Sequence, residues 1–246
     1  EIDIWNRDDF EDVEANGKSF ADLAKSLLNA YDGKVISVSN EAEITLEANP
    51  NSLNKSKLLS FRDAGINRIS IGAQSFNKKF LEFLGRDHSV YEAKRNIEYA
   101  REVFENVSFD LIYAMPNQTV YEWEKSLKTA FQFEPDHLSL YQLTIEEGTA
   151  FNQMYKKGNL IPIDNDLASE MYSITEDLTR KNKMPAYEVS NYSKKGRSCS
   201  HNLNYWEGGE WIGIGPGAVS RFFYNNKRTQ LDIRKDPCLL YTSDAA

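Results

Sequence analysis

Residues 68–74 read Arg68-Ile69-Ser70-Ile71-Gly72-Ala73-Gln74, a short apolar run that leads into a polar side chain. Three further apolar runs share this plan, and they lead into Glu47, Asp110 and Gln142. These polar residues recur at intervals of about 30 residues, the length of one strand–helix–strand unit. The pattern predicts an α/β fold built on a parallel sheet, either open or rolled into a barrel.

The polar residues at these positions also indicate a binding site. Side chains at the carboxyl ends of parallel strands converge on one face of the sheet, where ligands bind in both barrels and open sheets. The alternative is that each side chain only satisfies nearby backbone groups. That explanation suffices for one residue, but four residues in the same relative place favour a ligand site.

Length and composition limit the classes of function. The chain has 246 residues, 41% of them hydrophobic, which suits one large domain or a domain with a small appendage. Its net charge of −8 argues against nucleic acid as a main partner. Cys199 and Cys238 show no metal-ligand spacing, and so few cysteines favour a cytoplasmic location. No apolar run is long enough to cross a bilayer, and peripheral membrane association stays open.

Helical periodicity and capping signals fill the spaces between the apolar runs. Thr119 and Glu122 form a capping box at the start of one helix, and Gly65 ends another. We expect further helices at 19–31, 53–64, 77–84, 90–103 and 166–181, and a short strand at 187–189. We place a domain boundary near residue 150, which gives domains at 1–150 and 151–235. Residues 236–246 follow no earlier pattern, and we interpret them as a non-native tail.

Several segments together resemble one protein family. Residues 43–50, 65–76, 84–86, 109–113 and 137–143 are similar to the HemN/HemW branch of the radical S-adenosylmethionine (SAM) proteins. His201-Asn202-Leu203-Asn204-Tyr205-Trp206 and residues 213–218 resemble the HemW side of that branch, whose members are haem chaperones. Several motifs in the right order are more specific than any one of them.

The resemblance implies a partial (β/α) TIM-like barrel of the radical SAM type, with a small C-terminal α+β appendage. By matched position, it implies that Glu47, Gln74, Arg86 and Asp110 bind SAM. The chemistry agrees, because carboxylates suit the ammonium and hydroxyl groups of SAM, and an arginine fork suits its carboxylate. The alternative for Arg86 is a surface arginine at the end of a helix.

The sequence departs from the family in its iron–sulfur ligands. Radical SAM proteins hold a [4Fe–4S] cluster with three cysteines in a CxxxCxxC motif, and this motif is absent here. The family's glycine-rich GGGTP segment is also absent before Glu43. We interpret the chain as a piece of a longer protein whose preceding region carries the cluster.

The second motif concerns haem. HNxxYW is the proposed haem-binding motif of HemW proteins, which implies His201 as an axial ligand of the haem iron, with Asn202, Tyr205 and Trp206 beside it. We expect these residues in a glycine-rich loop. The alternatives are a histidine bonded only to backbone and a thiolate ligand from nearby Cys199. The basic residues at 194–197 are either a solvated loop or a site that attracts haem propionates.

Three functions remain open from the sequence. The first is a haem chaperone that delivers haem to an acceptor protein, using SAM and a cluster in the intact protein. The second is an oxygen-independent coproporphyrinogen III oxidase of porphyrin biosynthesis. The third is another radical SAM enzyme that shares only the barrel. The HNxxYW motif favours the first.

Overall fold

A computed structural model describes residues 2–5, 39, 41–215 and 217–233. The chain divides into two compact units, Glu1–Ser198 and Cys199–Ala246, which are described separately below. The helix predicted at 19–31 and the tail at 236–246 lie outside the described residues. Residues 151–198 pack with the first unit, so the observed division follows Ser198 and not the boundary expected near residue 150.

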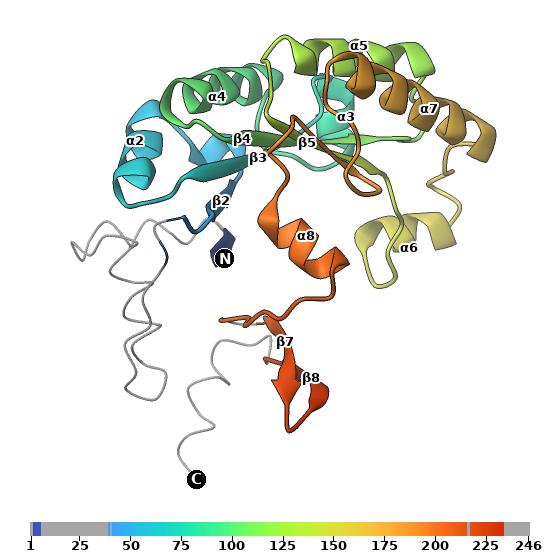
Figure 1. The fold of residues 1–246 in the computed structure, drawn as a ribbon. Coiled ribbons are helices and arrows are strands. Elements are labelled where there is room, and N and C mark those ends of the chain that lie inside the picture. Colours follow the sequence, from blue (N-terminus) through green and yellow to red (C-terminus); the bar gives the residue numbers. More distant parts are fainter. Residues whose placement is uncertain (1, 6–38, 40, 216, 234–246) are drawn as a thin grey trace. The chain divides into compact units, whose positions relative to one another are not determined.

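The first unit is built on a six-stranded sheet (Figure 1). Its strands follow in spatial order as β1 (Ile2–Trp5), β2 (Ile44–Ala48), β3 (Arg68–Gln74), β4 (Val107–Tyr113), β5 (His137–Gln142) and β6 (Asn191–Ser193). The first five strands are parallel, and β6 runs antiparallel to β5. The strand predicted at 187–189 begins a few residues later than expected, since β6 pairs with β5 from Asn191.

Helices join these strands where the sequence predicts them, and one further helix, at Ala150–Lys156, was not predicted. They are the 3-10 turn η3 (Pro50–Ser52) and helices α2 (Lys55–Asp63), α3 (Lys78–Phe83), α4 (Val90–Val103), α5 (Val120–Phe131), α6 (Ala150–Lys156) and α7 (Asn165–Lys181). Capping boxes start α4 at Ser89 and α5 at Thr119. Figure 1 shows α2, α4, α5 and α7 along one side of the sheet. This alternation is a partial TIM-like (β/α) barrel, which confirms the predicted class.

Side-chain alternation gives each of the strands β2 to β5 one apolar row that packs against the helices. In β3 this row is Ile69, Ile71 and Ala73, all fully buried. On β4, Tyr113 stacks on Trp123 of α5 with ring centroids 4.9 Å apart. The indole Nε1 of Trp123 then donates to Thr175 Oγ1 of α7 over 2.8 Å. One aromatic pair and one hydrogen bond therefore connect the sheet to two helices.

A buried carboxylate joins the amino ends of the strands to a helix. Asp136 immediately precedes β5, and its side chain is 9% exposed. It forms ion pairs with Arg101 of α4 and with Lys194, which follows β6. It also accepts a hydrogen bond from the Val107 backbone N–H at the start of β4. Removing one partner from such a buried group costs more than losing an exposed pair.

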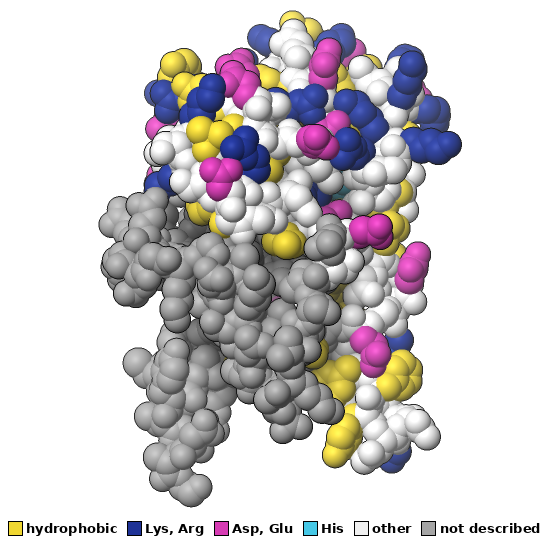
Figure 2. Space-filling view, turned by 60° about the vertical axis from the view of Figure 1, so that its left-hand side comes forward, with side chains coloured by type: hydrophobic (Ala, Val, Ile, Leu, Met, Phe, Trp, Pro, Cys, Tyr) yellow, Lys and Arg dark blue, Asp and Glu magenta, His cyan; other side chains and the backbone are white. Residues whose placement is uncertain are grey.

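The outer surface of the helices carries charges of both signs. On the face shown in Figure 2, Lys and Arg side chains alternate with Asp and Glu over the top of the molecule. The pair Lys78–Glu82 on α3 is mostly solvent-exposed. Exposed pairs of this kind contribute about 0–1 kcal/mol, so the buried rows hold this unit together. Within the described residues, no helix has the length and apolar character needed to cross a bilayer.

The second unit is small. It contains helix α8 (Ser200–Trp206) and an antiparallel hairpin of β7 (Val219–Tyr224) and β8 (Lys227–Asp232). Asn225 and Asn226 join the strands with φ of 50° and 58°. Two adjacent residues with positive φ suit the turn that matches strand twist, and asparagine tolerates that conformation. The helix and hairpin form the predicted α+β appendage.

The buried row of β3 gives a test of the core. We predict that Ile71→Ala lowers the free energy of unfolding by about 2–5 kcal/mol, because the cavity it leaves lies between sheet and helices. Ile71→Val, as the matched control, should cost about 0.5–1.5 kcal/mol. Urea unfolding followed by circular dichroism measures both. A loss below about 0.5 kcal/mol for the alanine variant, in a cooperative transition, would place Ile71 at the surface.

Candidate functional site

The opposite face of the sheet carries a polar row. In the parallel register, Glu47, Ser70, Ser108 and His137 stand level with one another on four adjacent strands. Register partners in a parallel sheet share a face, so these side chains line the side opposite the apolar row. Ser70, Ser108 and His137 are buried, and Glu47 is partly buried. A sheet that buries hydroxyls, an imidazole and charges together is arranged around polar contacts.

Both ring nitrogens of His137 have hydrogen-bond partners. Its Nδ1 lies 2.8 Å from Ser108 Oγ, and its Nε2 lies 2.7 Å from the Tyr187 hydroxyl. Burial lowers the pKa of His137 well below its usual value, and the positive charge of Arg68 adds to this shift. The imidazole is therefore neutral in this environment and serves to fix neighbouring hydroxyl groups.

Asp110 is the electrostatic centre of the polar face. It stands fourth of seven residues in β4 and level with Ser139, so it lies within the strand and not at its exit. Burial of its carboxyl group raises the pKa of Asp110 to about 6. Hydrogen bonds from Ser139 and Ser70, the latter of 3.3 Å, and the charges of Arg68 and Arg86 oppose that rise.

Gln74 reaches this face through a bulge. Between Ile71 and Gln74 the pairing of β3 with β4 shifts register, and Gln74 has a φ of 62°. An ideal Cβ on Gly72 would lie 2.9 Å from Gln74 Nε2, so the amide folds back over Gly72. Gly72 lies two residues beyond Ser70, on the polar face. The glycine thus makes room for Gln74 beside the predicted site.

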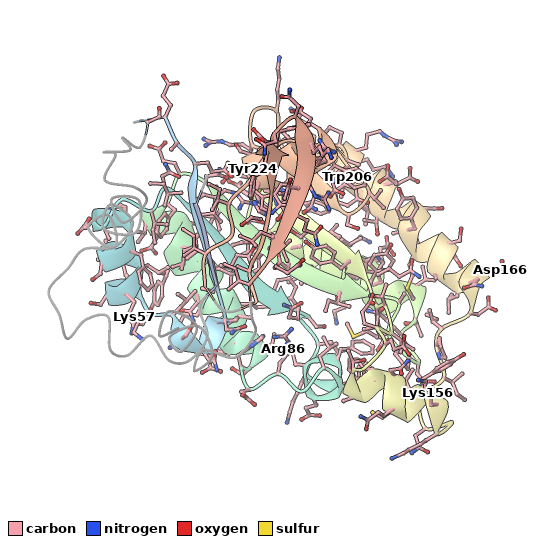
Figure 3. The ribbon with its side chains drawn as sticks, turned by 90° about the horizontal axis from the view of Figure 1, so that it is seen from below. Lys57, Arg86, Lys156, Asp166, Trp206 and Tyr224 are labelled. Carbon is pink, nitrogen blue, oxygen red and sulfur yellow. The ribbon has the colours of Figure 1, made fainter. Side chains whose placement is uncertain are left out.

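Arg86 comes to the same region from outside the sheet. It follows α3 after Gly85, whose φ is 66°, and it is labelled in Figure 3. Its Nε is buried without a hydrogen-bond partner, and its charge contributes to the pKa of Asp110. A guanidinium with a buried, unused N–H donor is suited to bind a carboxylate. Arg86 as a whole is partly buried, and its role in binding SAM stays a prediction.

One charged residue of this face was not predicted from the sequence. Arg68, the first residue of β3, is 3% exposed and donates to Thr45 Oγ1 over 3.4 Å. Its Nε is also buried without a hydrogen-bond partner. The available signal was an arginine beginning an apolar strand, a position where a buried charge needs a partner. The structure thus brings two arginines and two carboxylates, Glu47 and Asp110, to one face.

This residue set fits SAM and does not fit an iron–sulfur cluster. SAM offers a carboxylate, cationic groups and hydroxyls, which match the arginines, carboxylates and Gln74 respectively. The described residues hold no group of three potential metal ligands among His, Cys, Asp and Glu. The sequence has only two cysteines, fewer than the three thiolates that the cluster needs. The thiolates of this sequence therefore cannot complete a cluster site of the family's kind.

The haem motif lies on a helix and not in the expected loop. His201, Asn202, Tyr205 and Trp206 all belong to α8, which begins after buried Cys199. His201 and Tyr205 are four residues apart and share one helical face, with ring centroids 4.4 Å apart. Asn202 and Trp206 share the adjacent face, and Trp206 is 62% exposed.

The segment after α8 holds this aromatic group in place. Tyr205 packs on Trp211 with ring centroids 4.1 Å apart. Asn204 Nδ2 donates to the Glu210 carbonyl over 3.1 Å, and a Cβ on Gly209 would lie only 1.9 Å from Asn204 Oδ1. Gly209 therefore permits the close approach of the helix and the following chain. Asn204 is a structural residue that the sequence analysis did not single out, although the Gly208-Gly209 pair was a signal.

Comparisons with known proteins agree with this geometry. A family profile described as "Radical SAM superfamily" matches residues 14–130 of the chain. The sequence is 44% identical over 183 residues to the mitochondrial radical S-adenosyl methionine domain-containing protein 1 of Mus musculus, covering 74% of this chain and 41% of that protein. It is 36% identical over 195 residues to heme chaperone HemW of Bacillus subtilis, covering 79% and 52%.

Two further comparisons concern Escherichia coli proteins. Heme chaperone HemW is 39% identical over 189 residues, covering 76% of this chain and 49% of that protein. The structure of coproporphyrinogen III oxidase HemN superposes with a TM-score of 0.68 at 20% identity, covering 87% of this chain and 50% of that chain, which shows a shared fold. The chain spans about half the length of the curated relatives it matches.

The chain belongs to the radical SAM superfamily, as the family profile and the sequence identities of 44%, 36% and 39% to these relatives show. Within the superfamily it is a HemW-type protein, as its similarity to the bacterial heme chaperones shows. This confirms the family resemblance seen in the sequence. The family implies SAM and a [4Fe–4S] cluster as cofactors.

The shifted pKa of Asp110 predicts a pH dependence of stability. The folded-state value of about 6 exceeds the ordinary value of 3.8, so the protonated carboxyl stabilises the fold below about pH 4. This contribution is lost as the pH rises through about 6. We expect the difference in unfolding free energy between wild type and Asp110→Asn to change by about 2 kcal/mol from pH 4 to pH 7.

Chemical denaturation across that pH range measures this difference, in which other titrating groups cancel. Asp63→Asn is the control, because Asp63 is a largely exposed carboxylate on α2. Its difference from wild type should stay within about 0.5 kcal/mol throughout. A constant difference for Asp110→Asn would show that the carboxyl group is well solvated.

Proposed function

We propose that this chain is part of a haem-binding chaperone that delivers haem to an acceptor protein and also binds SAM. The observation that carries the proposal is the cluster of aromatic rings that His201 and Tyr205 of α8 form with Trp211. An imidazole is a good axial ligand for iron, and aromatic rings provide an apolar surface for a macrocycle. Relatives named heme chaperone HemW, at 36% and 39% identity, support it.

His201 is the proposed iron ligand, in preference to the Cys199 thiol. Cys199 is buried just before α8, whereas His201 is only partly buried. A ligand that receives haem from solution and passes it to a partner needs to be accessible. We propose that Asn202, Tyr205 and Trp206 contribute packing and polar contacts around the ring. Trp206, labelled in Figure 3, is well exposed for such a role.

The haem ligand is tested by titration with hemin, followed by Soret absorbance. We predict that the wild-type chain binds haem and that His201→Ala removes most of the affinity, because the iron loses its protein ligand. Cys199→Ala should leave the affinity largely intact and serves as the matched control. Equal affinities for wild type and His201→Ala would refute the ligand assignment, and loss in Cys199→Ala alone would assign the role to the thiolate.

The SAM site is proposed on the polar face of the sheet, at Glu47, Gln74, Arg86 and Asp110. The supporting observations are the unpartnered Nε of Arg86, its electrostatic influence on Asp110 and the Gln74 amide folded over Gly72. The arginine would hold the SAM carboxylate, and the carboxylates would hold cationic or hydroxyl groups. When reduced by a cluster, SAM supplies radical chemistry in this superfamily.

Calorimetric titration of SAM into the chain tests this assignment. We predict that Arg86→Gln weakens SAM binding about 10-fold to 100-fold, since a hydrogen bond to a charged partner contributes about 1.5–3 kcal/mol. Arg62→Gln is the control, because Arg62 is an exposed arginine paired with its neighbour Asp63. An unchanged affinity in Arg86→Gln, with the variant folded by circular dichroism, would contradict the proposal.

A further inference from the structure

A continuous series of aromatic and arginine contacts leads from the haem motif into the hairpin of the second unit. His201 contacts Tyr205, and Tyr205 contacts Trp211. The guanidinium carbon of Arg221 then lies 5.0 Å from the ring centroid of Trp211. We call these four residues the aromatic–arginine ladder. It joins a candidate iron ligand at one end to a cation at the other.

Backbone pairing fixes the cationic end of the ladder. Trp211 and Arg221 exchange two backbone hydrogen bonds of 2.8 and 2.9 Å. The indole Nε1 of Trp211 donates to the Val219 carbonyl over 3.0 Å. A Cβ on Gly213 would lie 2.5 Å from that same carbonyl oxygen, so glycine allows the segment to lie against β7. Arg221 is thus held by strand pairing and ring stacking, and not by a flexible loop.

A second arginine lies beside the first. Phe223 shares a strand face with Arg221, being two residues further along β7, and its cross-strand partner is Arg228. The Arg228 guanidinium carbon lies 5.5 Å from the Phe223 ring centroid. One face of the hairpin therefore carries two guanidinium groups stacked on aromatic rings.

These two cations are not neutralised by carboxylates in the part of the chain that the structure describes. Arg221 donates to the neutral amide oxygen of Gln230 over 3.2 Å, and Arg228 donates to the Gly208 carbonyl. The ion pairs among described residues involve neither arginine. The nearby Glu210 carboxylate accepts a hydrogen bond from the Phe223 backbone N–H.

We propose that Arg221, assisted by Arg228, binds the carboxylate groups of the porphyrin and so selects haem with free propionates. This rests on the proposed haem-binding function. A porphyrin of this kind presents an apolar ring and carboxylates at its edge. A guanidinium stacked on an aromatic ring keeps its in-plane N–H donors, and its fork matches a carboxylate. The basic residues at 194–197 are less suitable, since Lys194 already pairs with Asp136.

The experiment compares two probes on the full 246-residue chain, hemin and hemin dimethyl ester, which lacks the propionate charges. Wild type should bind hemin more tightly than the ester. Arg221→Gln should lose about tenfold in hemin affinity and keep its ester affinity, so that the preference disappears. Arg221→Lys should keep part of the preference, since it retains charge without the fork. Arg228→Gln should show a smaller loss.

The control is Arg180→Gln, which removes a largely exposed arginine from α7 in the first unit and should leave both affinities unchanged. Equal loss for hemin and ester in Arg221→Gln would show a packing role and overturn the proposal. Unchanged preference in Arg221→Gln would also overturn it, while loss of binding in His201→Ala would leave the chaperone proposal standing. Absence of hemin binding by wild type would overturn both.

Discussion

The two-residue repeat of the parallel strands is the constraint on which the first unit depends. It sends Ile69 and Ile71 to one face and Arg68 and Ser70 to the other, and both faces are buried. The apolar face gains stability by packing on helices. The polar face gains little from burial and must satisfy each of its donors and acceptors. Such a face costs stability unless its groups are paired, which is consistent with the SAM site proposed there.

Much of this unit could be predicted because its signals are local. Capping boxes at Ser89 and Thr119 fix helix starts within four residues of sequence, and the apolar runs define β2 to β5. Non-local features were missed. The bulge that turns Gln74 inward depends on pairing between β3 and β4, and the burial of Arg68 depends on the closure of strands around it. Neither is visible in a sequence window.

The haem motif also has tertiary contacts that could not be predicted from the sequence. Its residues were identified from the sequence, but the expected glycine-rich loop is a helix followed by glycines. Gly209 exists for the approach of Asn204, and Gly213 for the approach of Val219, so both glycines report contacts with other segments. The pairing of Trp211 with Arg221 joins residues ten positions apart that no helical or strand period relates. The sequence pattern predicted the haem-motif residues, and only the structure shows which residues contact them.

Asp110 links the cost of the polar face to its proposed use. Its raised pKa means that the folded chain loses stability at neutral pH by keeping a carboxylate among buried groups. The same low-polarity surroundings strengthen the attraction of that carboxylate for a cation. A cationic ligand such as SAM would therefore lower the pKa of Asp110 and recover part of the lost stability on binding. The hydrogen bond from Ser139 and the charges of Arg68 and Arg86 oppose the rise in the pKa of Asp110, and its value of about 6 leaves the carboxylate ionised at pH 7. If SAM binds there as proposed, the burial that lowers stability at Asp110 is the same feature that favours its ligand, as expected where function competes with stability.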